Sequence, residues 1–146
     1  MGFFPFTIIP LILYVLAALF LYDHANYVVE PGQVALHPFW SEAVLSFTLV
    51  SGQNWALSYG DLLITIAIVF VLFSLLKTAS TSKTTILGNM IMVLVLCVYI
   101  ILFLTVDFAG TSTFFILTVI ALVDTLATVS ISMVASHSTM DAVPDD

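Results

Sequence analysis

Four long apolar runs dominate this sequence and restrict the folds that are open to it. They cover about residues 6–22, 57–77, 86–106 and 114–135. A helix needs roughly 20 apolar residues to cross a hydrocarbon core about 30 Å thick, and each run is close to that length. The second run reaches it if residues 57–61 add a turn, where Ser58 and Asp61 can form a capping box. The sequence therefore predicts an all-α fold: a four-helix transmembrane bundle that forms a single membrane domain over residues 1–146.

The composition of the chain supports a membrane protein and argues against several other classes. Hydrophobic residues make up 62% of the sequence and charged residues 8%, whereas soluble domains average roughly 45–50% and about 25%. The chain has two lysines and no arginine, so it lacks a basic patch that could hold a nucleic-acid backbone. Its single cysteine, Cys97, cannot form an internal disulfide. The expected partners are membrane lipids and other transmembrane helices, and nucleic acid is not expected.

The two lysines predict how the bundle is oriented in the membrane. Lys77 and Lys83 lie in or beside the short segment between the second and third runs. Because positive residues favour the cytoplasmic side, this segment is expected to be cytoplasmic. Both termini then lie on the same side, and the loop of residues 23–56 lies on the outer face. The polar and acidic residues 136–146 are interpreted as a cytoplasmic tail.

The outer loop is too long for a simple connection, and we expect it to be folded. Pro31-Gly32 suits a type II turn, which predicts a short hairpin or a pair of extended arms over residues 27–36. Residues 41–50 are interpreted as a short helix that lies at the membrane interface. Trp40, Trp55 and Tyr59 are assigned to the aromatic belt beside it.

The fourth run contains a carboxylate, Asp124, that ought to avoid lipid. An ionised group near the bilayer centre costs about 2.5–3.5 kcal/mol on insertion scales, so it should face protein or water. At about 100° per residue, small and hydroxylated residues share its side of the helix. We call this set the polar seam: Thr118, Ala121, Asp124, Thr125, Thr128 and Ser132.

Two interpretations of the polar seam are open. In the favoured one, the carboxyl group bonds to a neighbouring helix and fastens the bundle or a subunit interface. In the other, Asp124 takes up and releases a proton or cation during transport. No other run has a charged residue at mid-depth. The neutral partners that the other runs offer are Tyr14, Thr65, Ser74 and Tyr99.

The outer loop holds a second set of candidate residues, which are of types that bind metals. They are Asp23, His24, Glu30, His37 and Glu42. Their spacing matches no recognised metal-ligand pattern. A hydrated acidic loop is therefore favoured over a site for a metal or a partner protein.

No cofactor is predicted for this chain. All three histidines lie outside the apolar runs, which argues against a haem held between helices. Binding of a pigment or quinone stays open, because the many aromatic residues could line such a ligand. The argument against it is that no polar group is placed to orient the ligand. The chain offers no arrangement of nucleophile and base, so it is not expected to be an enzyme.

Two short stretches of the fourth run carry a family resemblance: TSTFF at residues 111–115 and ALVD at residues 121–124. With them, the chain resembles a group of uncharacterised small four-span inner-membrane proteins of alphaproteobacteria. In that group the last helix runs into a basic cluster, whereas here it runs into Val134-Ala-Ser-His-Ser. The resemblance implies four spans and a bacterial inner membrane, and it implies no activity.

These features together predict a non-catalytic integral membrane subunit or accessory protein. It would associate with itself, as a homo-oligomer, or with a larger membrane complex such as an energy-transducing one. The alternative function is a small proton- or cation-coupled transporter or channel, with Asp124 as the titrating group. The expected location is the bacterial inner (cytoplasmic) membrane, with the mitochondrial inner membrane as the alternative.

Overall fold

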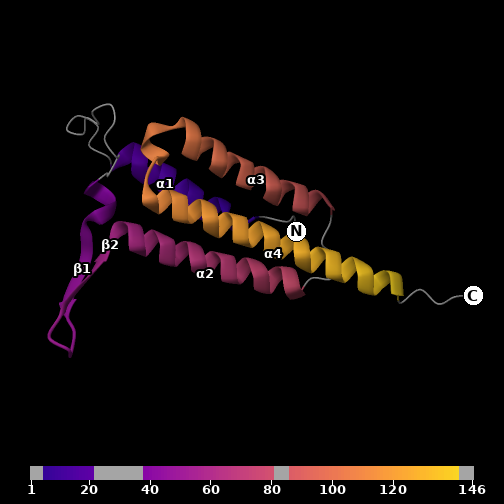
Figure 1. The fold of residues 1–146 in the computed structure, drawn as a ribbon, viewed down its shortest axis with the longest axis horizontal. Coiled ribbons are helices and arrows are strands. Elements are labelled where there is room, and N and C mark those ends of the chain that lie inside the picture. Colours follow the sequence, from indigo (N-terminus) through magenta and orange to yellow (C-terminus); the bar gives the residue numbers. More distant parts are fainter. Residues whose placement is uncertain (1–4, 22–37, 81–85, 142–146) are drawn as a thin grey trace, which may run out of the picture.

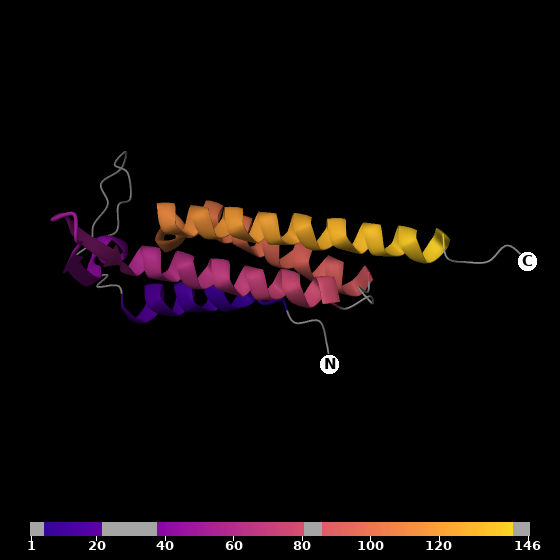
Figure 2. The same ribbon diagram turned by 90° about the horizontal axis from the view of Figure 1, so that it is seen from below.

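Four helices lie side by side, and successive helices run in opposite directions (Figures 1 and 2). The computed structural model describes residues 5–21, 38–80 and 86–141, with side chains up to residue 138. The elements in chain order are α1 (Ile8–Phe20), η1 (Pro38–Ser41), β1 (Ala43–Thr48), β2 (Asn54–Ser58), α2 (Tyr59–Ser80), α3 (Ile86–Thr105), η2 (Asp107–Ala109) and α4 (Ser112–Asp141). The prediction of four helices is confirmed.

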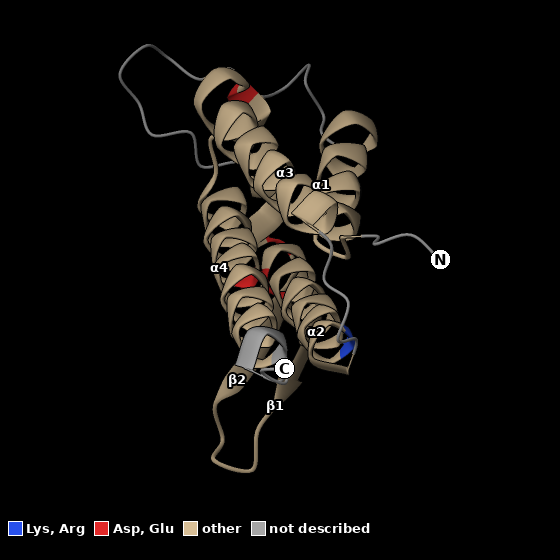
Figure 3. Cartoon of the chain, turned by 90° about the vertical axis from the view of Figure 1, so that its right-hand side faces the viewer, with Lys and Arg blue, Asp and Glu red and all other residues tan. Residues whose placement is uncertain are grey.

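Three of the helices, α2, α3 and α4, are long and apolar enough to cross a membrane. Charged residues are sparse along the bundle (Figure 3), which suits a membrane protein. Helix α1 is apolar but has only 13 residues, so it rises about 20 Å where the hydrocarbon core needs about 30 Å. A crossing by this segment would also need residues on either side of α1.

Two helices, α2 and α4, begin or end at residues other than the predicted ones. Helix α2 begins at Tyr59 rather than at residue 57, because Leu57 and Ser58 belong to strand β2. Helix α4 continues to Asp141, although residues 136–141 were assigned to the tail. No glycine or proline interrupts the chain between Ala135 and Asp141, so nothing in the backbone ends the helix earlier.

The loop of residues 23–56 contains a small antiparallel sheet in a mostly helical chain. The all-α prediction therefore holds only in part, and the predicted helix over residues 41–50 is wrong. Strands β1 and β2 pair with Phe47 opposite Trp55 and Thr48 opposite Asn54. The turn depends on Gly52, whose φ of +81° is readily adopted by glycine. Only η1 is helical nearby, and it ends at Ser41. The predicted hairpin over residues 27–36 lies outside the described residues.

Aromatic rings form the core at the end of the bundle that carries the sheet. Tyr14 of α1 stacks on Trp40 of η1, with ring centroids 4.7 Å apart and planes 8° apart. Phe114 of α4 contacts Tyr14 at 4.8 Å and Tyr99 of α3 at 5.6 Å. Trp40 is therefore buried in this core and does not belong to an interfacial aromatic belt, whereas Trp55 and Tyr59 are exposed. The core packs η1 against α1 and, through Tyr14 and Phe114, connects it to α4 and α3.

Candidate functional site

Asp124 lies in the interior of the bundle, where it joins α4 to two other segments. Its side chain is 0% exposed. Its Oδ2 accepts hydrogen bonds from Thr7 Oγ1 at 2.9 Å and from Ser74 Oγ at 3.4 Å. Thr7 is the residue before α1, and Ser74 lies in α2. The carboxyl group thus lies at the N-terminal end of α1, where the helix dipole favours negative charge.

Helix α3 is connected to the same group of residues through Thr7. The hydroxyl of Tyr99 donates to the Thr7 carbonyl oxygen at 2.7 Å, and Tyr99 is buried. Hydrogen bonds therefore link Asp124 of α4 directly to Thr7, before α1, and to Ser74 of α2. Through Thr7 they also reach Tyr99 of α3. We call Thr7, Ser74, Tyr99 and Asp124 the Asp124 network.

Of the four neutral partners that the sequence offered, Ser74 bonds to Asp124 directly and Tyr99 bonds through Thr7. Tyr14 instead donates to the Phe108 carbonyl oxygen at 2.8 Å and shares a hydrogen bond of 2.6 Å with Thr111 Oγ1. Thr65 donates to the carbonyl oxygen of Asp61 on its own helix. Neither of these two contacts the carboxyl group.

Thr7 was not predicted as a partner of Asp124. Residues 7 and 124 are separated by 117 positions in the sequence, and their bond is the shorter of the two to the carboxyl group. The available signal was that Thr7 is the single threonine or serine in the first apolar run. A hydroxyl at the start of such a run usually indicates an N-cap, yet here it makes no cap hydrogen bond.

Two buried side-chain oxygens beside each other on α4 have no hydrogen-bond partner among the described residues. They are Asp124 Oδ1 and Thr128 Oγ1. Positions 124 and 128 are one helical turn apart and so share a face of α4. Buried polar atoms without a protein partner are commonly bonded to internal water. This face of α4 therefore has unused hydrogen-bonding capacity next to the carboxyl group.

The rest of the polar seam also turns toward the inside of the bundle. Ser132 donates to Asn89 Oδ1 of α3 at 3.1 Å and to the Thr128 carbonyl oxygen at 2.8 Å. Thr125 and Thr118 donate to carbonyl oxygens one turn earlier in α4. Ala121, Thr125, Thr128 and Ser132 are buried, and Thr118 is half-buried. The structure thus places the seam against helices of the same chain.

Most of the candidate residues of the loop 23–56 lie outside the described part of the chain. Asp23, His24, Glu30 and His37 all lie there, so their proposed metal or partner site stays a prediction. Glu42 is described and exposed, and its backbone bonds to Pro38 and Tyr59. Among residues 5–21, 38–80 and 86–141, no three His, Cys, Asp or Glu side chains gather as metal ligands.

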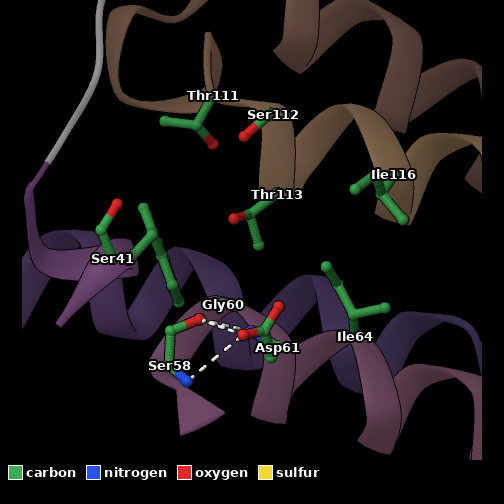
Figure 4. A pocket seen from close by; sticks show the side chains of 10 residues that line it. Ser41, Ser58, Gly60, Asp61, Ile64, Thr111, Ser112, Thr113 and Ile116 are labelled. Carbon is green, nitrogen blue, oxygen red and sulfur yellow. Dashed lines mark hydrogen bonds between the residues drawn. The ribbon is translucent and has the colours of Figure 1, made fainter. Parts of the chain in front are cut away.

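A cavity of about 350 Å³ lies at the sheet end of the bundle, between η1, β2 and the first turns of α2 and α4 (Figure 4). The predicted capping box is confirmed at its edge: the Ser58 N–H donates to Asp61 Oδ2 at 3.3 Å, and the Asp61 N–H donates to Ser58 Oγ at 3.2 Å. A Cβ on Gly60 would lie 2.8 Å from Thr113 Oγ1. Glycine therefore allows α2 and α4 to approach closely here.

Comparisons with known proteins give no match to a family model, to a curated protein or to a solved structure. The resemblance to small four-span proteins of alphaproteobacteria therefore stays a prediction. What the chain does has to be argued from the burial, hydrogen bonds and surfaces described above.

Proposed function

We propose that this chain is a non-catalytic integral membrane subunit or accessory protein. It has four spans and associates with itself or with a larger membrane complex, such as an energy-transducing one. The observation that carries the proposal is the Asp124 network, in which a fully buried carboxyl group bonds to hydroxyls of two other segments of the chain. This arrangement suits a group that fastens the helices to one another.

The physical reason for such a fastening is the cost of a polar group in lipid. In hydrocarbon, the carboxyl group would have no donor to bond with, whereas the hydroxyls of Thr7 and Ser74 supply donors inside the bundle. Because the same contacts connect three segments, they also select one arrangement of the helices. The carboxyl group accordingly contributes to the specificity of the fold rather than to a reaction.

Association with other chains would then use surfaces other than the polar seam, since the seam is already packed inside the chain. The outward residues of the helices are apolar and exposed, and they suit lipid or other transmembrane helices. Examples are Leu72 and Phe73 on α2, Leu94 and Ile101 on α3, and Leu126 on α4.

The proposed topology places both termini in the cytoplasm of a bacterium and the chain in its inner membrane. Lys77 lies in the last turn of α2, at the end away from the sheet. It supports a cytoplasmic location for that end. The hairpin and the loop between α3 and α4 then lie on the outer face.

Purification in mild detergent, with the Asp124→Asn variant, tests the proposed function. An amide oxygen still accepts hydrogen bonds, so we expect Asp124→Asn to keep the same oligomer or the same partners at unchanged stoichiometry, as measured by native mass spectrometry. Asp107→Asn makes the same chemical change at an exposed position and is the matched control. A chain that purifies only as a monomer without partners would contradict the proposal.

A second candidate function is proton- or cation-coupled transport through Asp124. The observation in its favour is the unpartnered pair of buried oxygens, Asp124 Oδ1 and Thr128 Oγ1, which could bond to water or to a transported ion. In proteoliposomes, this function predicts an ion flux that Asp124→Asn abolishes and Asp107→Asn leaves intact, with both variants folded. Equal flux in the wild type and in Asp124→Asn would exclude it.

A further inference from the structure

The hairpin formed by β1 and β2 has one face of large apolar side chains and one face of mostly small or polar side chains. Its register places Leu45 opposite Leu57 and Phe47 opposite Trp55. Because side chains alternate between the two faces of a strand, these four residues share one face. We call them the apolar hairpin face. The pairs between them, Ser46 with Ala56 and Thr48 with Asn54, share the other face.

The protein itself leaves the apolar hairpin face largely uncovered. Leu45 is 58% exposed, Phe47 56% and Trp55 43%. The rings of Phe47 and Trp55 contact each other, with centroids 5.0 Å apart. A two-stranded hairpin is marginally stable in water by itself and usually needs its apolar face packed against something else. Exposure of contiguous aromatic and leucine side chains therefore indicates a surface that is covered in the membrane or in an assembly.

The position of the hairpin relative to the helices indicates what covers it. Strand β2 ends at Ser58 and α2 begins at the next residue, Tyr59. The hairpin lies crosswise to the helices and projects beyond the side of the bundle (Figures 1 and 3). If α2 crosses the membrane, a segment that lies crosswise at its end runs along the membrane surface.

The composition of the hairpin favours lipid over a charged protein partner. Residues 43–58 include no acidic, basic or histidine side chain. The hairpin therefore has no charge that could form an ion pair with a partner protein. Tryptophan and other amphipathic aromatic residues concentrate at the boundary between lipid headgroups and acyl chains. The outward side chains of α2, such as Ile68 and Val69, are also apolar and exposed.

We propose that the apolar hairpin face docks on the phospholipid bilayer and holds the outer end of the bundle at the headgroup–acyl boundary. Leu45, Phe47 and Trp55 enter this boundary, while Ser46, Thr48 and Asn54 face water. The inference rests on the proposed membrane location of the chain. It adds a second mode of membrane contact, in the plane of the surface, to the transmembrane helices.

Site-directed spin labelling of the full chain in nanodiscs of neutral phosphatidylcholine tests this inference. Cys97 is exposed on α3, so a label on the native thiol reports whether the bundle is embedded. In a Cys97→Ser background, Leu45→Cys and Phe47→Cys place labels on the apolar face. Ser46→Cys and Thr48→Cys are the matched controls on the opposite face. Each label is scored by its accessibility to oxygen, which concentrates in lipid, and to a water-soluble nickel chelate.

We expect accessibility to alternate with the two-residue period of a strand. The ratio of oxygen to chelate accessibility should be severalfold higher for labels at positions 45 and 47 than at 46 and 48. Chelate access that is equal on both faces would overturn the inference, because the hairpin would then lie in water. Protection of positions 45 and 47 from both reagents would also overturn it, because protein would then cover the face.

The label on Cys97 separates failure of this inference from failure of the proposed function. If the label at position 97 is more accessible to the nickel chelate than to oxygen, the chain is not embedded in lipid and the proposed membrane location is wrong. If position 97 is in lipid but the hairpin shows no alternation, only the hairpin inference fails. Circular dichroism of each variant establishes that the helices are retained.

Discussion

The hydrogen bond between Thr7 and Asp124 can be measured directly, and its strength tests the role given to the Asp124 network. Thr7 is 3% exposed and Asp124 0% exposed, and the bond between them is 2.9 Å long. Thr7→Val removes the hydroxyl with little change in shape. Asp124→Leu removes the acceptor without creating a large cavity. Combining the two substitutions in a double-mutant cycle isolates the energy of the pair.

The expected coupling energy follows from the environment of the bond. Hydrogen bonds between membrane helices average about 0.6 kcal/mol and reach about 1.7 kcal/mol. This bond has near-ideal length and both partners are buried, so we expect a value in the upper half of that range. A bond to a charged group is stronger, at about 1.5–3 kcal/mol. A coupling well above 2 kcal/mol would therefore indicate that the carboxyl group is ionised inside the bundle.

The free energy of unfolding of the four proteins in the cycle can be followed by circular dichroism in mixed micelles with increasing denaturing detergent. Thr125→Val is the matched control, because Thr125 is 6% exposed but its hydroxyl bonds to Ala121 of its own helix. Because this bond lies within one helix, we expect Thr125→Val to leave the free energy of unfolding nearly unchanged. A coupling energy of zero between positions 7 and 124 would refute the view that this bond fastens the bundle.

Two further substitutions test contacts that hold the helices together. Gly60→Ala should destabilise the fold by about 1–3 kcal/mol, because the added methyl group would overpack against Thr113. Gly110→Ala is the control and should change the thermal midpoint little, because the nearest atom to its added methyl group is 3.4 Å away. Equal thermal midpoints for the two variants would contradict the close approach of α2 and α4. Tyr99→Phe removes the 2.7 Å bond to the Thr7 carbonyl. It should lower the free energy of unfolding by about 0.5–1.5 kcal/mol, because a buried hydrogen bond is lost while the Thr7 carbonyl, at the N-cap of α1, keeps its bond within the helix. A stability equal to that of the wild type would mean that water replaces the hydroxyl.

Much of the helical architecture could be predicted because it depends on local properties of the chain. Hydropathy over about 20 residues is enough to recognise α2, α3 and α4. The Ser58–Asp61 capping box is likewise formed by residues three positions apart. The inward face of α4 followed from the periodicity of its small and polar residues, since a carboxyl group and several hydroxyls are poorly placed against lipid.

The error over residues 41–50 shows where local reasoning has too little information. A short run that contains Val44, Leu45 and Phe47 suits an interfacial helix and a strand about equally well. The choice was made by pairing with residues 54–58 across a turn at Gly52. Pairing is a property of two segments, and the first segment by itself does not reveal it.

The amino-acid sequence alone therefore determined that the four long apolar segments form helices, which side of α4 turns inward and where α2 is capped, because hydropathy, periodicity and capping act over a few turns of chain. Only the tertiary structure decided that Thr7 reaches Asp124, that Gly60 meets Thr113 and that the hairpin leaves an apolar face uncovered. Those contacts join residues far apart in the sequence, and they depend on the relative heights and rotations at which the helices pack, which no single segment specifies.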